Sequence, residues 1–264
     1  MTEIQALEGF TKTSFCDEGI EKPVYRLGDL GCPPVLIMQE LPGMTVHTLA
    51  LAEKLVSDGF VVYLPHLFGD IAAPIAVAKN ALRLCLQKEF NFLAWRKPSP
   101  ITNWLRALCR FISTENGERP IGAIGMCLTG RFVLSLMVEK SMTAPVMSQP
   151  GHPGGHGNAK KAATLGIPES ELAEAKARVR DDGLCILGLR FQNDPFCPPD
   201  RFTTMEREFG ENFIRFDIDA SLYAEHNIRK DAHAVLTIDA SEDPDHPTQQ
   251  AYAKMLGFFK KRIA

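Results

Sequence analysis

The stretch Ile121-Gly-Ala-Ile-Gly-Met-Cys-Leu-Thr-Gly130 decides how the rest of this sequence is interpreted. Its first half is an apolar run typical of a buried strand, and an apolar, helix-like segment follows it. Between them, glycine, any residue, cysteine, two residues and glycine form the pattern of a sharp strand-to-helix turn, with a thiol where the nucleophile elbow usually carries a serine. Because a nucleophile on so tight a turn needs small neighbours, Gly125 and Gly130 fit the motif around Cys127.

A helix that begins just after Cys127 would direct free backbone N–H groups and its positive end at the sulfur, which favours the thiolate. The alternative is a buried structural cysteine on an ordinary strand-loop-helix crossover, and so short a motif does not exclude it. The choice between the two depends on the rest of the chain.

Length and composition are those of a soluble globular protein. The chain has 264 residues, 45% hydrophobic and 23% charged, with a formal net charge of −3. This balance gives no basic surface for nucleic acid or an anionic membrane. The first ten residues, MTEIQALEGF, carry acidic side chains where a signal peptide has basic ones, and apolar stretches stay short of the roughly 18 residues of a membrane helix. We therefore expect a cytoplasmic protein with no nucleic-acid or membrane partner.

The cysteines point to a reducing compartment. Seven are scattered along the chain without a CxxC pair, which argues against a disulfide framework or a zinc site. Cys85, Cys109 and Cys185 lie in apolar patterns and are expected in the core. Cys197 falls in a polar loop, where we expect it to be exposed.

Alternating strand and helix patterns predict an α/β fold. The expected strands are Val35–Gln39, Phe60–Leu64, Ile121–Met126, Ala144–Ser148, Leu184–Arg190 and Phe213–Asp217. The expected helices are Thr45–Asp58, Ala76–Glu89, Ile101–Thr114, Leu128–Glu139, Glu169–Asp181, Asp200–Phe209 and Thr248–Arg262. Of these, we expect Glu169–Asp181 to be mostly solvated. This alternation indicates a doubly wound, mostly parallel sheet with helices on both faces, and a single domain over residues 1–264. In such sheets, ligands bind outside the carboxyl ends of the strands.

The Gly-rich segment 149–157, QPGHPGGHG, places two histidines four residues apart. With no cysteine or carboxylate beside them and no fixed geometry, we expect a loop at the carboxyl edge of the sheet rather than a metal site.

An acid and a base also follow strand ends, as a triad requires. Asp194 lies after the strand Leu184–Arg190, and His233 lies after the last strand. The order nucleophile, acid, histidine is that of α/β-hydrolases. Asp194 could instead cap the Asn-Asp-Pro turn. His226 and His246 are the rival bases; His246 is in a polar loop that we expect to be solvated, and position in the loop favours His233 over His226.

These residues resemble the dienelactone hydrolase family. Gln39-Glu40-Leu41-Pro42-Gly43 looks like the family's strand-end Gln-Glu segment, and Tyr63-Leu-Pro-His-Leu-Phe-Gly69 looks like its proline-containing strand exit. The cysteine elbow and the residues that follow His233 are similar to the family's pattern as well. The resemblance extends from about Val24 to the C-terminus, although Thr129 stands where a small residue is usual and residues 151–182 look like an insertion.

The resemblance implies an α/β-hydrolase fold and a cysteine hydrolase with Cys127, Asp194 and His233 as its triad. It also implies an oxyanion hole formed by the backbone N–H groups of Leu41 and Leu128, with Glu40 as an extra carboxylate beside the thiol. The substrate would be a small ester or lactone, and no cofactor or metal is required. The basic side chains that hold a substrate carboxylate in the family have no clear counterparts in this sequence, and Lys88 and Arg96 are the candidates.

A different class of function stays open on the sequence alone. The chain could be a non-hydrolytic α/β-hydrolase-like protein in which Cys127 senses oxidants or a ligand occupies the pocket. It could also be a scaffold with a vestigial elbow.

Overall fold

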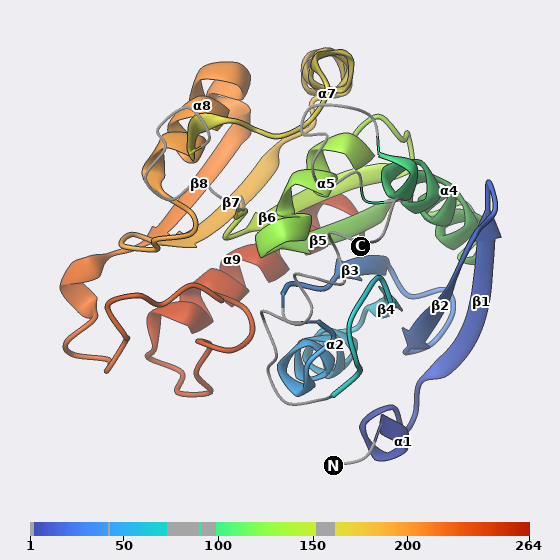
Figure 1. The fold of residues 1–264 in the computed structure, drawn as a ribbon, viewed down its shortest axis with the longest axis horizontal. Coiled ribbons are helices and arrows are strands. Elements are labelled where there is room, and N and C mark those ends of the chain that lie inside the picture. Colours follow the sequence, from blue (N-terminus) through green and yellow to red (C-terminus); the bar gives the residue numbers. More distant parts are fainter. Residues whose placement is uncertain (1–2, 42, 73–89, 91–98, 152–161) are drawn as a thin grey trace.

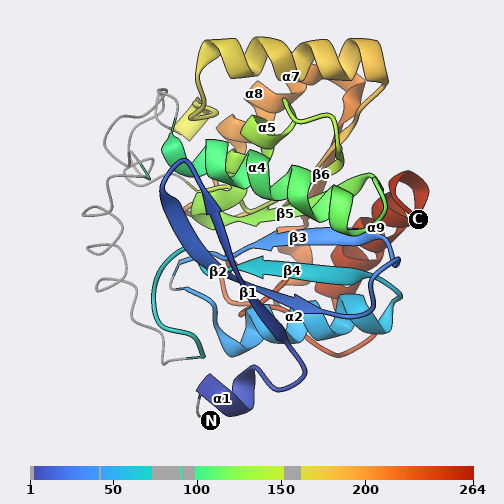
Figure 2. The ribbon, with the colours of Figure 1, turned by 90° about the vertical axis from the view of Figure 1, so that its right-hand side faces the viewer.

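The computed structural model describes residues 3–41, 43–72, 90, 99–151 and 162–264, which are organised around an eight-stranded sheet (Figures 1 and 2). Its strands lie in the order β1-β2-β4-β3-β5-β6-β7-β8. Their bounds are β1 Thr11–Asp17, β2 Ile20–Leu27, β3 Pro34–Met38, β4 Val61–Pro65, β5 Ile121–Met126, β6 Met142–Ser148, β7 Ile186–Phe191 and β8 Phe213–Ile218. β1 and β2 join antiparallel, and every pair from β4 to β8 is parallel. The predicted mostly parallel sheet is confirmed.

Helices cover both faces of the sheet (Figure 2). α2 (Val46–Ser57) and α9 (Pro247–Arg262) pack on one face, and α4 (Pro100–Glu115), α5 (Gly130–Leu136), α7 (Glu169–Asp182) and α8 (Pro199–Phe209) lie on the other. Successive side chains of a strand point to opposite faces, so Leu36 and Met38 of β3 enter one core while Val35 and Ile37 enter the other. This two-sided burial explains the uninterrupted apolar runs of the central strands. A short helix, α1 (Glu3–Ala6), lies at the N-terminal end.

The structure departs from the expected elements where the sequence pattern is weak. The β1–β2 hairpin was not predicted, because β1 is mostly exposed and β2 contains Pro23. α5 ends at Leu136, short of the expected Glu139. α7, in contrast, is mostly solvated as expected, with only Glu171, Ala175 and Val179 buried.

Several sequence interpretations fall outside the described residues. The expected helix Ala76–Glu89, Cys85, the guesses Lys88 and Arg96, and the two histidines of segment 149–157 all lie there. Of the other predicted core cysteines, Cys109 is buried and Cys185 is half-buried.

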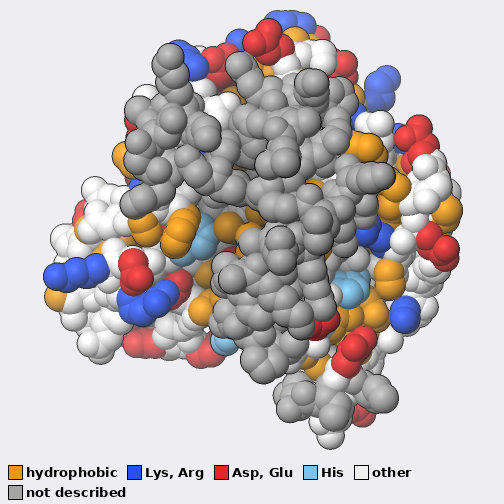
Figure 3. Space-filling model, viewed as in Figure 1, with side chains coloured by type: hydrophobic (Ala, Val, Ile, Leu, Met, Phe, Trp, Pro, Cys, Tyr) orange, Lys and Arg blue, Asp and Glu red, His pale blue; other side chains and the backbone are white. Residues whose placement is uncertain are grey.

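Charge is mixed over the surface, as the small net charge suggests. On the face shown in Figure 3, Lys and Arg side chains are interspersed with Asp and Glu. In the part of the chain that the structure describes, every helix is too short or too polar to cross a bilayer. The same part holds no cluster of three side chains able to ligate a metal.

His246 does not lie in a solvated loop as the sequence suggested. It is buried and forms the N-cap of α9, where its Nδ1 atom accepts a hydrogen bond from Thr248 N at 3.2 Å and lies 2.7 Å from Thr248 Oγ1. The ring packs against His226, with centroids 5.5 Å apart. Burial, then the charge of His226, lowers the pKa of His246 from 6.5, against the pull of Asp243. The cap requires a neutral ring, because a protonated Nδ1 cannot accept a hydrogen bond.

Because the neutral His246 ring caps α9, we predict that the protein loses stability in mild acid. Since the folded-state pKa lies below the unfolded value of 6.5, stability is fully present above about pH 6.5 and declines as pH falls through the folded-state value. His246→Asn keeps a side-chain acceptor that does not titrate, so its unfolding free energy should depend less on pH in this window. Urea denaturation of both proteins at several pH values would measure this, and parallel curves would contradict it.

Candidate active site

The turn after β5 is strained in the way that the sequence predicted. Cys127 has φ 50°, a left-handed conformation that is unusual for a residue with a side chain. It begins a 3-10 segment, Cys127–Thr129, that leads into α5. A Cβ atom on Gly125 would lie 2.6 Å from Thr129 O, and one on Gly130 would lie 2.8 Å from Pro150 Cβ. Both glycines are therefore required by contact with neighbouring backbone and side chains.

Thr129 ties the elbow to the neighbouring strand, which gives a reason for a hydroxyl at this position. Its Oγ1 accepts a hydrogen bond from Met126 N at 2.9 Å. The same oxygen lies 3.0 Å from Met38 O at the end of β3 and 2.9 Å from Met126 O, and its single proton serves one of them at a time. This side chain thus links the C-terminal ends of β3 and β5, where Met38 pairs with Gly125 in the parallel sheet.

The Leu41 and Leu128 backbones lie on these two linked exits. Leu128 is the second residue of the 3-10 segment, and Leu41 follows β3 by three residues. The first N–H groups of a helix have no hydrogen-bond acceptor within it, and Leu128 occupies such a position.

Gly151 lies against the half-buried Cys127 thiol, and Arg201 lies within electrostatic range of it. Gly151 N donates to Cys127 O at 2.9 Å, and a Cβ on Gly151 would come within 3.2 Å of the sulfur. The buried Arg201 guanidinium bonds Pro150 O, and its Nε donates to Thr164 O at 3.0 Å. Burial lowers the pKa of Arg201, while Cys197, Cys127 and Asp194 oppose that shift. A buried cation thus lies within electrostatic range of the sulfur.

Asp194 both caps its turn and binds His233, so the two interpretations from sequence hold together. Its Oδ1 accepts hydrogen bonds from Phe196 N at 2.8 Å and Cys197 N at 3.1 Å. Its Oδ2 lies 2.7 Å from His233 Nδ1. Because an ionised carboxylate only accepts, Nδ1 carries the proton and Nε2 is the ring's basic atom.

The electrostatics of His233 connect it to Cys127. Burial alone lowers the pKa of His233, but the charge of the Cys127 sulfur and the Asp194 hydrogen bond outweigh it and raise that pKa well above 6.5. Nε2 is buried and makes no well-aligned hydrogen bond to the described residues, although the sulfur is close enough to interact with it. Such loose geometry is common before substrate binds. His226 packs on His246 instead.

Glu40 is buried and bound by two neutral side chains. Thr237 Oγ1 donates to one carboxyl oxygen, and Gln149 Nε2 donates to the other at 3.1 Å. Burial raises the pKa of Glu40, against the opposing effects of Thr237, His233 and Gln149. These contacts direct the carboxyl group to the His233 loop and the exit of β6.

Cys197 was expected to be exposed and is not. Its side chain is fully buried, and burial raises the pKa of the thiol to about 12. Gln192 and Asn193 of its loop face solvent, while Cys197 itself belongs to the hydrophobic core.

Sequence reasoning missed Gln149, Arg201, Thr237 and Asp239 as parts of this site. Gln149 directly follows β6, so its place at the carboxyl end of a strand was a usable signal. Arg201 lies in the first turn of α8, and the other two lie in an irregular segment, where no periodicity marks them.

Comparisons with known proteins identify the family and the fold. A family model described as "Dienelactone hydrolase family" matches residues 26–263. A candidate dienelactone hydrolase from Klebsiella pneumoniae superposes with a TM-score of 0.66 at 17% identity, covering 96% of this chain and 98% of that one. Est1E from Butyrivibrio proteoclasticus gives 0.60 at 12% identity, covering 95% and 98%. An esterase from Pyrococcus furiosus gives 0.61 at 12% identity, covering 100% and 95%.

At these identities, the solved structures establish the α/β-hydrolase fold and no more. No curated protein matches the chain.

Proposed function

The chain belongs to the dienelactone hydrolase family and is a carboxylic-ester hydrolase, and we propose that it opens a small ester or lactone through a thioester on Cys127. One observation carries the proposal. His233 lies 2.7 Å from Asp194, and its pKa is raised by the sulfur of a cysteine that occupies a left-handed elbow at a strand end. That combination is the arrangement of an activated nucleophile, its base and the group that orients the base.

In the first half of the reaction, His233 Nε2 takes the proton of the Cys127 thiol, and the sulfur attacks the carbonyl carbon. The resulting oxyanion accepts hydrogen bonds from the Leu41 and Leu128 N–H groups. Loss of one such donor typically costs 10²–10³-fold in rate. The intermediate then collapses, the C–O bond to the leaving alcohol breaks, and His233 returns its proton to that oxygen.

In the second half, water attacks the thioester carbon while His233 removes its proton. Collapse of this intermediate breaks the C–S bond, releases the carboxylic acid and restores the thiol. With a lactone, the leaving alcohol stays attached to the acyl group, so the product is a single hydroxy acid. Asp194 keeps the proton on Nδ1 and stabilises the imidazolium at each step.

Glu40 regulates the nucleophile in this proposal. A carboxylate near the elbow opposes thiolate formation, in competition with His233 and the buried Arg201. Its bonds to Thr237 and Gln149 hold it within the site in the free protein, and an acyl group in the site would relieve its effect on the sulfur.

The remaining features are consistent with a small-molecule enzyme of the cytoplasm. The six described cysteines are unpaired, as in a reducing compartment. One sheet takes strands from Thr11 to Ile218, and α9 packs on it, which supports a single domain over residues 1–264 with an insertion near 151–182.

Turnover should depend on Cys127 and on no other described thiol. Cys127→Ala should lower kcat for p-nitrophenyl acetate and for a lactone by roughly 10⁴-fold or more, because the nucleophile is lost. Cys197→Ala is the matched control and should keep nearly full activity, since its thiol is buried and its backbone N–H still binds Asp194.

Equal losses in the two variants would overturn the assignment of Cys127. A wild-type protein that oxidises readily at Cys127 but turns over none of the esters would support the redox-sensing alternative.

Glu40→Gln should make Cys127 react faster with iodoacetamide at neutral pH. Removing one negative charge near the sulfur should accelerate alkylation by about tenfold, equivalent to about 1.4 kcal/mol. Because burial raises the pKa of Glu40, the two proteins should converge as pH falls and the wild-type carboxyl becomes protonated. Exposed Glu53→Gln on α2 is the control. Identical profiles for wild type and Glu40→Gln would remove Glu40 from the mechanism.

A further inference from the structure

The segment that carries His233 lacks regular secondary structure. Residues 223–246, between the 3-10 turn Ala220–Leu222 and α9, form turns and irregular backbone. Proton transfer needs the imidazole held within about 0.5 Å of its working position, and loops are less precise supports than strands or helices. Something other than secondary structure must therefore fix the His233 backbone.

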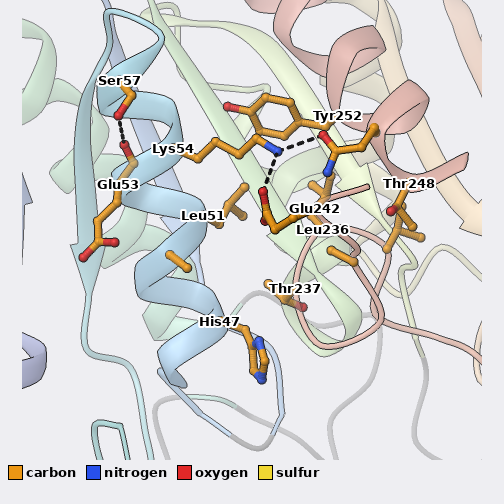
Figure 4. Close-up of a pocket in the computed structure, with 14 residues that line it drawn as sticks. His47, Leu51, Glu53, Lys54, Ser57, Leu236, Thr237, Glu242, Thr248 and Tyr252 are labelled. Carbon is orange, nitrogen blue, oxygen red and sulfur yellow. Dashed lines mark hydrogen bonds and ion pairs between the residues drawn. The ribbon is translucent and has the colours of Figure 1, made fainter. Parts of the chain in front are cut away.

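Packing supplies only part of this support. One side of the segment lines a hollow of about 460 Å³ between α2 and α9, bounded by Val235, Leu236 and Thr237 (Figure 4). Across the hollow, Lys54 of α2 donates to Gln249 at 2.9 Å and lies 4.2 Å from the centre of the Tyr252 ring. Val235 and Leu236 are also buried in the core, so packing holds that part of the segment, and hydrogen bonds add to this support at His233.

Asp239 provides those bonds at His233 itself. Its Oδ2 accepts from His233 N at 2.9 Å and from Ala234 N at 2.9 Å. Its Oδ1 accepts from Arg229 Nε at 3.3 Å and Nη2 at 3.0 Å. The Asp239 side chain is 11% exposed, so these bonds are largely shielded from water. The carboxylate thus binds the main chain of the imidazole-bearing residue, six residues away along the chain.

A second anchor acts just beyond it. Gln149 Oε1 accepts from Val235 N at 3.3 Å, and the Thr237 hydroxyl donates to Glu40. Residues 233 to 235 each have their backbone N–H bound by a side chain, and residue 237 is bound through its own side chain.

We propose that Asp239 is a positioning residue for the reaction, which sets the His233 imidazole against Cys127 by holding the backbone N–H groups of His233 and Ala234. The proposal rests on the assignment of His233 as the base. Asp239 acts on His233 through hydrogen bonds to the main chain, and its negative charge also raises the pKa of Glu40. Loss of the Asp239 hydrogen bonds should misplace the His233 imidazole while leaving the substrate pocket intact.

Two substitutions separate geometry from charge. Asp239→Asn keeps an oxygen in the same place without the charge, and Asp239→Glu keeps the charge but moves it by one methylene. Positioning predicts that Asp239→Asn stays within tenfold of wild-type kcat, whereas Asp239→Glu loses about 10²-fold in kcat, the effect of a misplacement near 1 Å. KM for p-nitrophenyl acetate should change little in both, a pattern that general destabilisation would not produce.

Two controls isolate the effect. Arg229→Gln removes the outer ion pair of a largely exposed arginine and should leave kcat near wild type. Asp219→Glu makes the same change at an exposed aspartate that accepts a hydrogen bond from the backbone N–H of Ser221, and it should also leave kcat near wild type. If circular dichroism shows that Asp239→Glu does not fold, Asp239→Ala takes its place with the same expected order.

Any other order overturns the proposal, including equal losses in both Asp239 variants, a greater loss in Asp239→Asn, or no loss in either. His233→Ala tests the premise separately. An inactive His233→Ala together with fully active Asp239 variants would refute the positioning role and leave the assignment of His233 as the base standing.

Discussion

The left-handed backbone of Cys127 is the constraint on which this structure depends. A side chain at φ 50° is strained, so it persists only where its surroundings determine it. Gly125 and Gly130 leave the necessary space, and the Thr129 hydroxyl fixes the turn to β3. The turn places the sulfur at the carboxyl end of the sheet, where every other part of the candidate site also lies.

Charged groups of both signs lie in the candidate site. The His233 imidazole and the buried Arg201 guanidinium each interact electrostatically with the Cys127 sulfur, and Glu40 and Asp194 are held in the site by hydrogen bonds. In the proposed mechanism, a small displacement of these groups changes the reactivity of the thiol. Thr237 and Gln149, which bind Glu40 and the His233 segment together, link such a displacement to the position of the base.

Local patterns in the sequence predicted the parts of the site that follow strand ends. The elbow could be recognised because tight turns require particular residues at fixed spacing, and Asp194 and His233 because parallel strands end at one edge. Position in the loop favoured His233 over His226 on the sequence alone, and the contact of His233 with Asp194 supports that choice. The sequence also did not mark Asp239 and Arg201 as residues of the site, because their partners lie far along the chain or in irregular backbone. Cys197 and His246 were misjudged because a polar loop can bury one of its members.

The most direct test of the central claim is mass spectrometry of the wild-type protein, quenched with acid during turnover of a p-nitrophenyl ester. A thioester on Cys127 would add the mass of the acyl group to the peptide that contains this residue, and the adduct would form with the initial burst of p-nitrophenol. Rapid turnover with the acyl group on another residue would contradict it, as would a Cys127 peptide that stays unmodified throughout the burst.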